Sequence, residues 1–216
     1  GSTLAGVFTR SATRSANVLD CQEKLANLDV GDGIGIVVNS GNANTFTGKR
    51  GVTDVDLISA AAANALDLPE GRIFTSATGV IGEPLDASKI TDAMADLVAA
   101  LRDDAAEDAA RAIMTTDTFA KGATATCEVG GVTVTIVGFA KGSGMIAPDM
   151  ATMLGYIFTD AAVTPEALQS MLSAANKVSF NAVTVDSDTS TSDTVLMAAT
   201  GRALNPQITS AEPGGP

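Results

Sequence analysis

Histidine and tryptophan are both absent from this sequence of 216 residues, and aromatic residues make up only 4% of it. Without imidazole, neither a Ser-His-Asp triad nor a Cys-His pair can be assembled from the chain. Imidazole-based zinc sites are excluded too, and two cysteines cannot complete a structural zinc site on their own. No metal site is therefore expected, and any general base must be a carboxylate, a lysine, water or a free α-amine.

Basic residues are also scarce, because 13 lysines and arginines face 25 aspartates and glutamates, which gives a formal net charge of -12. A surface this acidic repels phosphate backbones and anionic lipids, so neither a nucleic acid nor a membrane is expected as a partner. No apolar run approaches the roughly 20 residues that a membrane-spanning helix needs. Cys21 and Cys127 are expected to be free thiols in a reducing compartment, and we predict a cytoplasmic location.

Helical and strand-like periodicities occur in the same chain, which predicts an α+β fold with helices layered on sheets. Apolar residues at helical spacing predict helices over 53–68, 86–104 and 164–179, with Thr53, Asp86 and Thr164 as N-caps, and a shorter helix over 104–114. The small residues of 194–200 predict a further helix, which Gly201 can cap. Strands are predicted over 33–41, 153–161 and 181–185, and Gly130-Gly131 predicts a hairpin over 123–142.

Two segments match the motifs of known binding loops only in part. The stretch "GDGIGI" lacks the third glycine of a dinucleotide fingerprint and precedes its strand, so no nucleotide site is expected there. In "DSDTSTSD", Thr191 stands where a calcium loop needs glycine, and Met197 stands where it needs the closing glutamate. A polar turn is the better interpretation of this second segment.

The stretch "KGSGMIAPDMATML" places small residues and a proline ahead of Thr152. A threonine hydroxyl is a weak nucleophile, but the α-amine of an N-terminal threonine can activate it. That route requires a cut between Ala151 and Thr152, which the same hydroxyl can make by attacking the Ala151 carbonyl. From the residues alone, a nucleophile and a plain loop-to-strand junction both remain open.

A second candidate is "ATGVIG", where Thr78 and Gly79 can present adjacent backbone N–H groups to a developing oxyanion. An ordinary turn is the alternative there. Several polar, glycine-bearing stretches of this kind occur together in the chain, and their joint occurrence favours a site.

The stretch "KGSGMIAPDMATML" resembles the processing site of the ornithine acetyltransferase family, the bifunctional glutamate N-acetyltransferases of arginine biosynthesis. The resemblance continues in "GVFTR", "VNSGNAN", "ATGVIGEPL", "MTTDT" and "VDSDTSTSDT", which follow the family's order and cover nearly the whole chain. The resemblance implies a self-cleaving precursor with a layered αββα sandwich of helices on mixed and antiparallel sheets. Residues 1–151 would belong to its α-chain and residues 152–216 would begin its β-chain, with two copies of each fragment forming a heterotetramer.

The resemblance also implies roles for particular residues. Thr152 would be the nucleophile, Thr78 and Gly79 would form the oxyanion hole, and Thr118 and Lys141 would contact the substrate. Members of the family are nearly twice as long as this chain, so we expect a fragment whose remaining substrate ligands lie beyond Pro216.

The implied reaction is a ping-pong transfer of acetyl from N2-acetylornithine to glutamate, which yields ornithine and N-acetylglutamate. No cofactor is implied, although some members also use acetyl-CoA as a co-substrate. Two alternatives remain from the residues: an N-terminal-threonine amidase or aminopeptidase, in which water resolves the acyl-enzyme, and a non-catalytic truncated relative.

Overall fold

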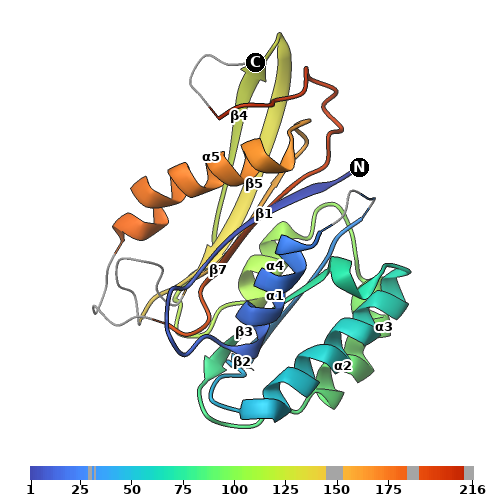
Figure 1. Cartoon of the computed structure of the whole chain (residues 1–216), viewed down its shortest axis with the longest axis vertical. Helices are drawn as coiled ribbons and strands as arrows, with labels where there is room; N and C mark the ends of the chain where they lie inside the picture. The colour runs from blue at the N-terminus through green and yellow to red at the C-terminus, as the bar shows by residue number, and fades with distance from the viewer. Residues whose placement is uncertain (29–30, 32, 145–152, 184–189, 212–216) are drawn as a thin grey trace.

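The computed structural model describes residues 1–28, 31, 33–144, 153–183 and 190–211, and these residues form two β-sheets and five α-helices (Figure 1). The strands are β1 (Thr3–Phe8), β2 (Gly35–Asn42), β3 (Ile73–Val80), β4 (Lys121–Val129), β5 (Val132–Lys141), β6 (Leu154–Thr159) and β7 (Thr194–Ala199). The helices are α1 (Ala16–Ala26), α2 (Gly48–Leu66), α3 (Ser88–Ala99), α4 (Ala106–Ala112) and α5 (Pro165–Val178), with short 3₁₀ turns at Glu70–Arg72 and Phe180–Ala182. Ala151 and Thr152 lie outside the described residues.

The larger sheet has five strands in the order β1-β7-β6-β5-β4. β6 and β7 are parallel, whereas the other neighbouring pairs are antiparallel, so this sheet is mixed. β2 and β3 form a separate parallel pair. The predicted α+β class, with a mixed sheet, is therefore confirmed.

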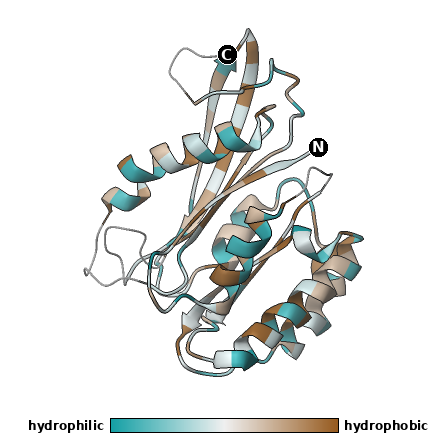
Figure 2. Cartoon of the chain, viewed as in Figure 1, coloured by the Kyte–Doolittle hydropathy of each residue, from teal (hydrophilic) through white to brown (hydrophobic). Residues whose placement is uncertain are grey.

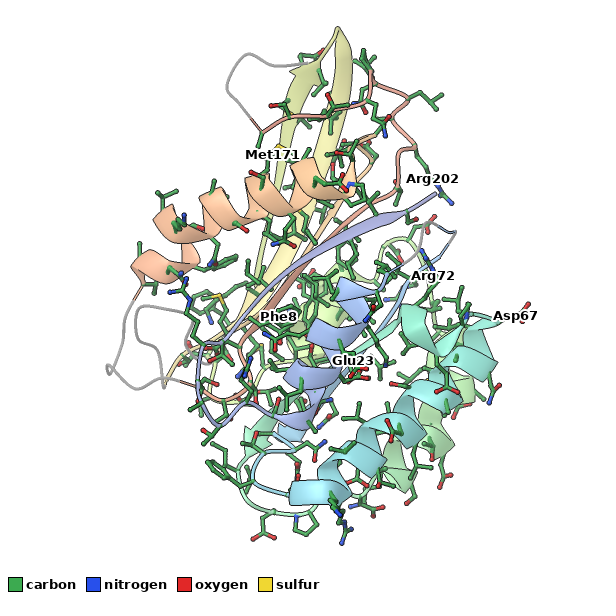
Figure 3. The ribbon with its side chains drawn as sticks, in the orientation of Figure 1. Phe8, Glu23, Asp67, Arg72, Met171 and Arg202 are labelled. Atoms are coloured by element: carbon green, nitrogen blue, oxygen red, sulfur yellow. The ribbon has the colours of Figure 1, made fainter. Side chains whose placement is uncertain are left out.

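The two sheets pack against each other, and helices cover their outer faces (Figure 1). α5 packs on one face of the five-stranded sheet, where Leu168 and Leu172 meet Ala5 and Val195. On the opposite face Tyr156 packs with Phe74 of β3 in a second buried cluster. α2 and α3 cover the far side of the two-stranded sheet. Figure 2 shows that α2, α3 and α5 carry both hydrophobic and hydrophilic residues. Figure 3 shows the side chains between these layers, with Met171 on α5 and Phe8 on β1 labelled.

Two local predictions are confirmed by backbone geometry. The Thr164 side chain accepts the N–H of Ala167, and Pro165 occupies the first position of α5, which is the arrangement expected of an N-cap followed by proline. Gly130 and Gly131 join β4 to β5 with φ values of 58° and 81°. A two-residue hairpin turn with positive φ at both positions suits glycine, so the sequence marks this turn clearly.

Two of the predicted N-caps are wrong. α2 begins at Gly48, well before Thr53, whose hydroxyl donates to the Lys49 carbonyl inside the helix. α3 begins at Ser88 and ends at Ala99, short of the predicted 104. The Asp86 carboxylate is occupied by the Ser88 hydroxyl, which donates to it, and so it does not cap the helix.

The predicted helix over 194–200 is wrong, because Thr194–Ala199 is the strand β7. β7 lies between β1 and β6, and it is buried on both faces. A central strand of this kind has no alternating polar residues, so its apolar run cannot be distinguished from a short helix by periodicity. The strand predicted over 181–185 is also contradicted at its start, because Phe180–Ala182 forms a 3₁₀ turn; residues 184 and 185 lie outside the described part.

No helix in the described ranges combines the length and the apolar character needed to cross a bilayer.

We predict that Leu168→Ala destabilises the protein by about 2 to 5 kcal/mol, because truncation leaves a cavity between α5 and the sheet. Leu168 is only 1% exposed, whereas Leu101 is 68% exposed and serves as a matched control. Leu101→Ala should change stability by no more than about 0.5 kcal/mol. Urea unfolding followed by circular dichroism measures both values, and equal losses in the two variants would contradict this packing.

Candidate active site

The site lies where β5 ends and where β6 and β7 begin. Lys141, the last residue of β5, pairs with Leu154, the first residue of β6, and Leu154 pairs in turn with Thr194 of β7. Just before these strands, the N–H of Met153 donates to Asp193 Oδ1 at 2.8 Å, and the N–H of Thr194 donates to the Met153 carbonyl at 3.0 Å. Segments far apart in the sequence are thus fixed at one edge of the sheet.

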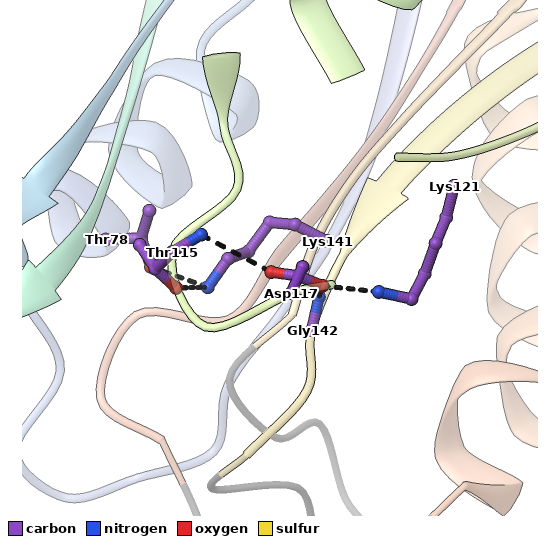
Figure 4. A network of polar contacts seen from close by, with 6 residues as sticks. All are labelled: Thr78, Thr115, Asp117, Lys121, Lys141 and Gly142. Carbon is purple, nitrogen blue, oxygen red and sulfur yellow. Dashed lines mark hydrogen bonds and ion pairs between the residues drawn. The ribbon is translucent and has the colours of Figure 1, made fainter. Parts of the chain in front are cut away.

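The side chain of Lys141 is buried at this edge, and the residue is only 2% exposed. Its Nζ donates to Thr78 Oγ1 at 3.0 Å and to Thr115 Oγ1 at 2.8 Å (Figure 4). Burial lowers the pKa of Lys141, and the nearby charge of Lys121 lowers it further, while Asp117 and Asp193 oppose the shift. Lys141 therefore presents a desolvated amino group whose partners are two threonine hydroxyls.

Asp117 ties the "MTTDT" segment to the end of β5. Its carboxylate accepts the N–H of Gly142 at 2.8 Å, accepts the N–H of Thr115 at 3.4 Å and forms an ion pair with Lys121 (Figure 4). Burial alone would raise the pKa of Asp117, but these hydrogen bonds together lower it. Asp117 is thus an ionised anchor that holds both the backbone beside Lys141 and the turn that carries Thr115.

Thr78 and Gly79 lie at the end of β3, opposite Ser40 and Gly41 of β2. Gly79 has a φ of 133°, and a Cβ added there would lie 2.3 Å from the carbonyl carbon of Gly41 and 2.6 Å from the Asn42 nitrogen. Glycine is therefore required for both its backbone angle and the close approach of the two chains. The Thr78 hydroxyl contacts Lys141, so the predicted oxyanion pair lies beside the predicted substrate-contacting lysine.

The "VNSGNAN" segment is tied to the last residue of β3, because the Ala43 N–H donates to the Val80 carbonyl at 2.9 Å. The Asn44 side-chain amide donates to Asn17 Oδ1 at 3.2 Å and to the Gly51 carbonyl at 3.0 Å, and its backbone N–H donates to Asn42 Oδ1 at 2.7 Å. The hydroxyl of Thr191 donates to Thr45 Oγ1 at 3.1 Å, which links this segment to the residues that precede β7. The motifs singled out in the sequence are therefore joined by buried hydrogen bonds.

The structure does not bring Thr118 to Lys141. Thr118 is exposed and lines a hollow between α4 and the β4–β5 hairpin, together with Phe119 and Gly138. Thr115, from the same segment, is the threonine whose hydroxyl meets Lys141. The sequence alone does not indicate which of the three neighbouring threonines contacts Lys141, because the contact depends on how the turn around Asp117 folds.

Asp117 and Asp193 were not identified from the sequence. "MTTDT" shows one acidic residue among hydroxyls, and Asp193 closes a segment that is typical of a polar turn. The contact between Asp193 and Met153 joins residues 40 positions apart in the chain, so no local signal predicts it.

A mixed α+β fold with a buried ammonium, a glycine-dependent strand end and converging hydroxyls defines a site of the kind that stabilises negative charge on a reacting oxygen. Comparison with known proteins gives the family. The ArgJ family model matches residues 1–213, and the chain therefore belongs to the ArgJ family.

Curated relatives are consistent with this assignment. The arginine biosynthesis bifunctional protein ArgJ of Ruegeria pomeroyi is 62% identical over 201 residues, which cover 93% of this chain and 49% of that protein. The protein of the same description from Agrobacterium fabrum is 53% identical over 212 residues, which cover 97% of this chain and 51% of the relative. The chain thus spans about half the length of the curated relatives it matches.

Solved structures show the same fold. The crystal structure of arginine biosynthesis bifunctional protein ArgJ from Bacillus halodurans superposes with a TM-score of 0.58 at 37% identity, covering 69% of this chain and 75% of that one. The ornithine acetyltransferase from Mycobacterium tuberculosis, solved in complex with ornithine, gives a TM-score of 0.54 at 29% identity, covering 68% of this chain and 75% of that one.

We predict that Gly79→Ala is more destabilising than Gly82→Ala by about 1 to 3 kcal/mol, the usual cost of overpacking. Both glycines have positive φ, 133° and 84°, so alanine strains the backbone at either position, but only at Gly79 does the added methyl meet another chain segment. Urea unfolding gives the difference, and chemical shifts of Gly41 and Asn42 should move only in Gly79→Ala. Equal stabilities would contradict the close approach of β2 and β3.

We also predict that Asp117→Asn lowers the pKa of Lys141 further, because the carboxylate is the leading influence that favours its ammonium form. Asp160→Asn is the matched control, since Asp160 Oδ1 also accepts a backbone N–H, that of Thr135, but at the other end of β5. Titration of the labelled lysine side chain by NMR measures both. A Lys141 titration that is the same in the two variants would be inconsistent with the network of Figure 4.

Proposed function

We propose that this chain is the part of an ArgJ-family acetyltransferase that carries the nucleophile, and that this nucleophile is Thr152. The observation that carries the proposal is the contact of Lys141 with Thr78 at the start of β6, where Lys141 pairs with Leu154, two residues after Thr152 in the chain. Because position 152 precedes β6 by two residues in the chain, we expect a nucleophile there to work close to this buried cation and the candidate oxyanion hole. This is the arrangement that acyl transfer requires.

The nucleophile becomes competent when the chain is cut between Ala151 and Thr152. The cut creates an α-amine, which titrates near pH 8 and is partly neutral at working pH, so it can accept the hydroxyl proton. The ammonium of Lys141 favours both a neutral amine and a deprotonated hydroxyl in its vicinity. This activation needs no imidazole, in keeping with a sequence that has none.

The proposed reaction follows a ping-pong course. Thr152 Oγ1 attacks the acetyl carbonyl of N2-acetylornithine, the N–H groups of Thr78 and Gly79 stabilise the oxyanion, and ornithine leaves. The amine of glutamate then attacks the acetyl ester on Thr152, and N-acetylglutamate leaves. The ornithine bound to the Mycobacterium tuberculosis relative supports this substrate class, and acetyl-CoA is a further candidate donor.

We assign the substrate contact beside Lys141 to Thr115 in preference to Thr118. The Thr115 hydroxyl is 2.8 Å from Lys141 Nζ, whereas Thr118 faces a separate hollow. Lys141 keeps the substrate-contacting role implied by the family resemblance.

The fold explains how fragments 1–151 and 152–216 would remain together after the cut. β5 precedes the cut and β6 follows it, yet they are hydrogen-bonded neighbours over Ile136–Lys141 and Leu154–Thr159. β1 of the first fragment also pairs with β7 of the second. Two such pairs of fragments would form the heterotetramer, and the free thiols of Cys21 and Cys127 suit the cytoplasmic location predicted for it.

We predict that the full-length protein appears as two fragments with a boundary between Ala151 and Thr152, and that Thr152→Ala remains one uncleaved, inactive chain. Loss of the nucleophile removes covalent catalysis, so acetyl transfer should fall by at least about 1,000-fold. Intact-mass spectrometry measures processing, and formation of N-acetylglutamate from N-acetylornithine and glutamate measures transfer. Thr126→Ala, on the exposed strand β4, is the control and should process and react normally.

The same assay separates the alternatives. Release of free acetate with no N-acetylglutamate would favour an N-terminal-threonine amidase. A single wild-type chain that is insensitive to Thr152→Ala would instead identify a non-catalytic relative.

A further inference from the structure

The proposed activation leaves the first step of self-cleavage without a base. Before the cut, the nitrogen of Thr152 is part of a peptide bond, and an amide nitrogen does not accept a proton at neutral pH. The α-amine that later activates the hydroxyl therefore does not yet exist. Since the sequence has no histidine, a carboxylate, a lysine or water must take the first proton. This inference rests on the proposed function.

Among the residues that the structure describes, Asp193 is a carboxyl group that is hydrogen-bonded to the residue directly after this position. It lies directly before β7 and is 0% exposed. Its Oδ1 accepts the N–H of Met153 at 2.8 Å, and that nitrogen belongs to the peptide bond formed by the carbonyl of Thr152. On the other side of Met153, the N–H of Thr194 holds the Met153 carbonyl at 3.0 Å. The backbone of Met153, which directly follows position 152, is thus held next to the Asp193 carboxyl by these two hydrogen bonds.

The second oxygen of this carboxyl is free. Asp193 Oδ2 is buried and has no hydrogen-bond partner among the residues that the structure describes. Burying an unsatisfied acceptor is unfavourable, so such groups are few and require an explanation. A donor brought to Oδ2 during the reaction supplies that explanation.

The other ionisable groups at this edge are less suited to accept a proton. Lys141 Nζ is a donor engaged by two hydroxyls. Asp117 is held by Lys121 and by the N–H groups of Gly142 and Thr115, and its pKa is lowered, which makes it a weak base. In the described part of this edge, Asp193 combines burial with an unengaged carboxyl oxygen.

The electrostatics of Asp193 suit a proton acceptor. Burial raises the pKa of Asp193 to about 7, while the Met153 N–H, the Ser190 side chain and the charge of Lys141 oppose the rise. Thr9, at the end of β1, donates its backbone N–H to the Asp193 carbonyl and adds no titrating group. A general base is most effective when its pKa is close to the working pH.

We propose that Asp193 is the general base of self-cleavage, with Oδ2 taking the proton of the Thr152 hydroxyl as that oxygen attacks the Ala151 carbonyl carbon. The bond between the Ala151 carbon and the Thr152 nitrogen then breaks, and Asp193 returns the proton to the departing nitrogen. The products are an ester between Ala151 and Thr152 Oγ1 and a free α-amine. Water hydrolyses the ester to an Ala151 carboxyl group and the Thr152 hydroxyl, and Asp193 is regenerated.

The ionised form of Asp193 is the active one. The rate of cleavage is therefore low when the carboxyl is protonated, rises with pH through about 7 and levels off above it. This pH profile is a signature that a purely structural role of Asp193 would not produce.

The test uses the full-length precursor made by cell-free translation. Cleavage is followed at several pH values from about 5.5 to 8.5, which span the effective range of such a base. Samples are quenched in acid over time, and the cleaved fraction is measured by intact mass. Asp193→Asn keeps an oxygen for the Met153 N–H but cannot accept the proton, so cleavage should slow by about 100-fold or more. The residual rate should lose its rise near neutral pH. Asp160→Asn is the control, because the Asp160 carboxyl also accepts a backbone N–H but lies elsewhere in the fold. This variant should be cleaved with the wild-type rate and pH profile.

Each result decides the proposal. Wild-type rate and pH profile in Asp193→Asn would overturn it while leaving self-cleavage at Thr152 intact. If circular dichroism shows that Asp193→Asn does not fold, the wild-type profile decides, and a flat profile between the two pH limits overturns the assignment. If the wild-type precursor is never cut and behaves like Thr152→Ala, the proposed function itself is overturned. That result is distinct from a failure of the role of Asp193 alone.

Discussion

In the five-stranded sheet, β6 pairs with β5 in antiparallel orientation and with β7 in parallel orientation, and this combination determines what meets at the start of β6. The antiparallel pair brings the end of β5, with Lys141, to the beginning of β6. The parallel pair brings the residue before β7, Asp193, to the residue before β6, Met153. A shift of one residue in either register would turn these side chains to the other face, so the site depends on the packing of both faces of the sheet.

Burial gives the site its electrostatic character. Lys141 is removed from water and is compensated by the Thr78 and Thr115 hydroxyls, with the ionised Asp117 held nearby. A buried polar network of this kind is rigid only when its members are satisfied, and here most of them are. The unengaged oxygen of Asp193 is an exception at the same edge, which is why it points to chemistry. The groups that hold the geometry of the site are thus distinct from the group that we propose exchanges a proton.

The sequence predicts those parts of the fold that local geometry controls. The Gly130-Gly131 hairpin and the start of α5 at Thr164 carry their own signals, and both are confirmed. β7 was predicted as a helix because a strand buried on both faces shows no alternation, and β1 and α1 were not predicted because their partners lie far along the chain. Within the site, the resemblance identified Thr78, Gly79 and Lys141, which the fold brings together, but the choice of Thr115 and the position of Asp193 depend on tertiary contacts.

The central claim is that Thr152, as a new N-terminal residue, carries the acetyl group between donor and acceptor. The most direct measurement is to mix mature full-length protein with N-acetylornithine in the absence of glutamate, quench it in acid and map the acetylated peptides by mass spectrometry. We predict an acetyl ester on the peptide that begins at Thr152. This ester should disappear when glutamate is added before the quench. An acetyl group on any other residue, or active protein in which position 152 remains inside an uncut chain, would contradict it.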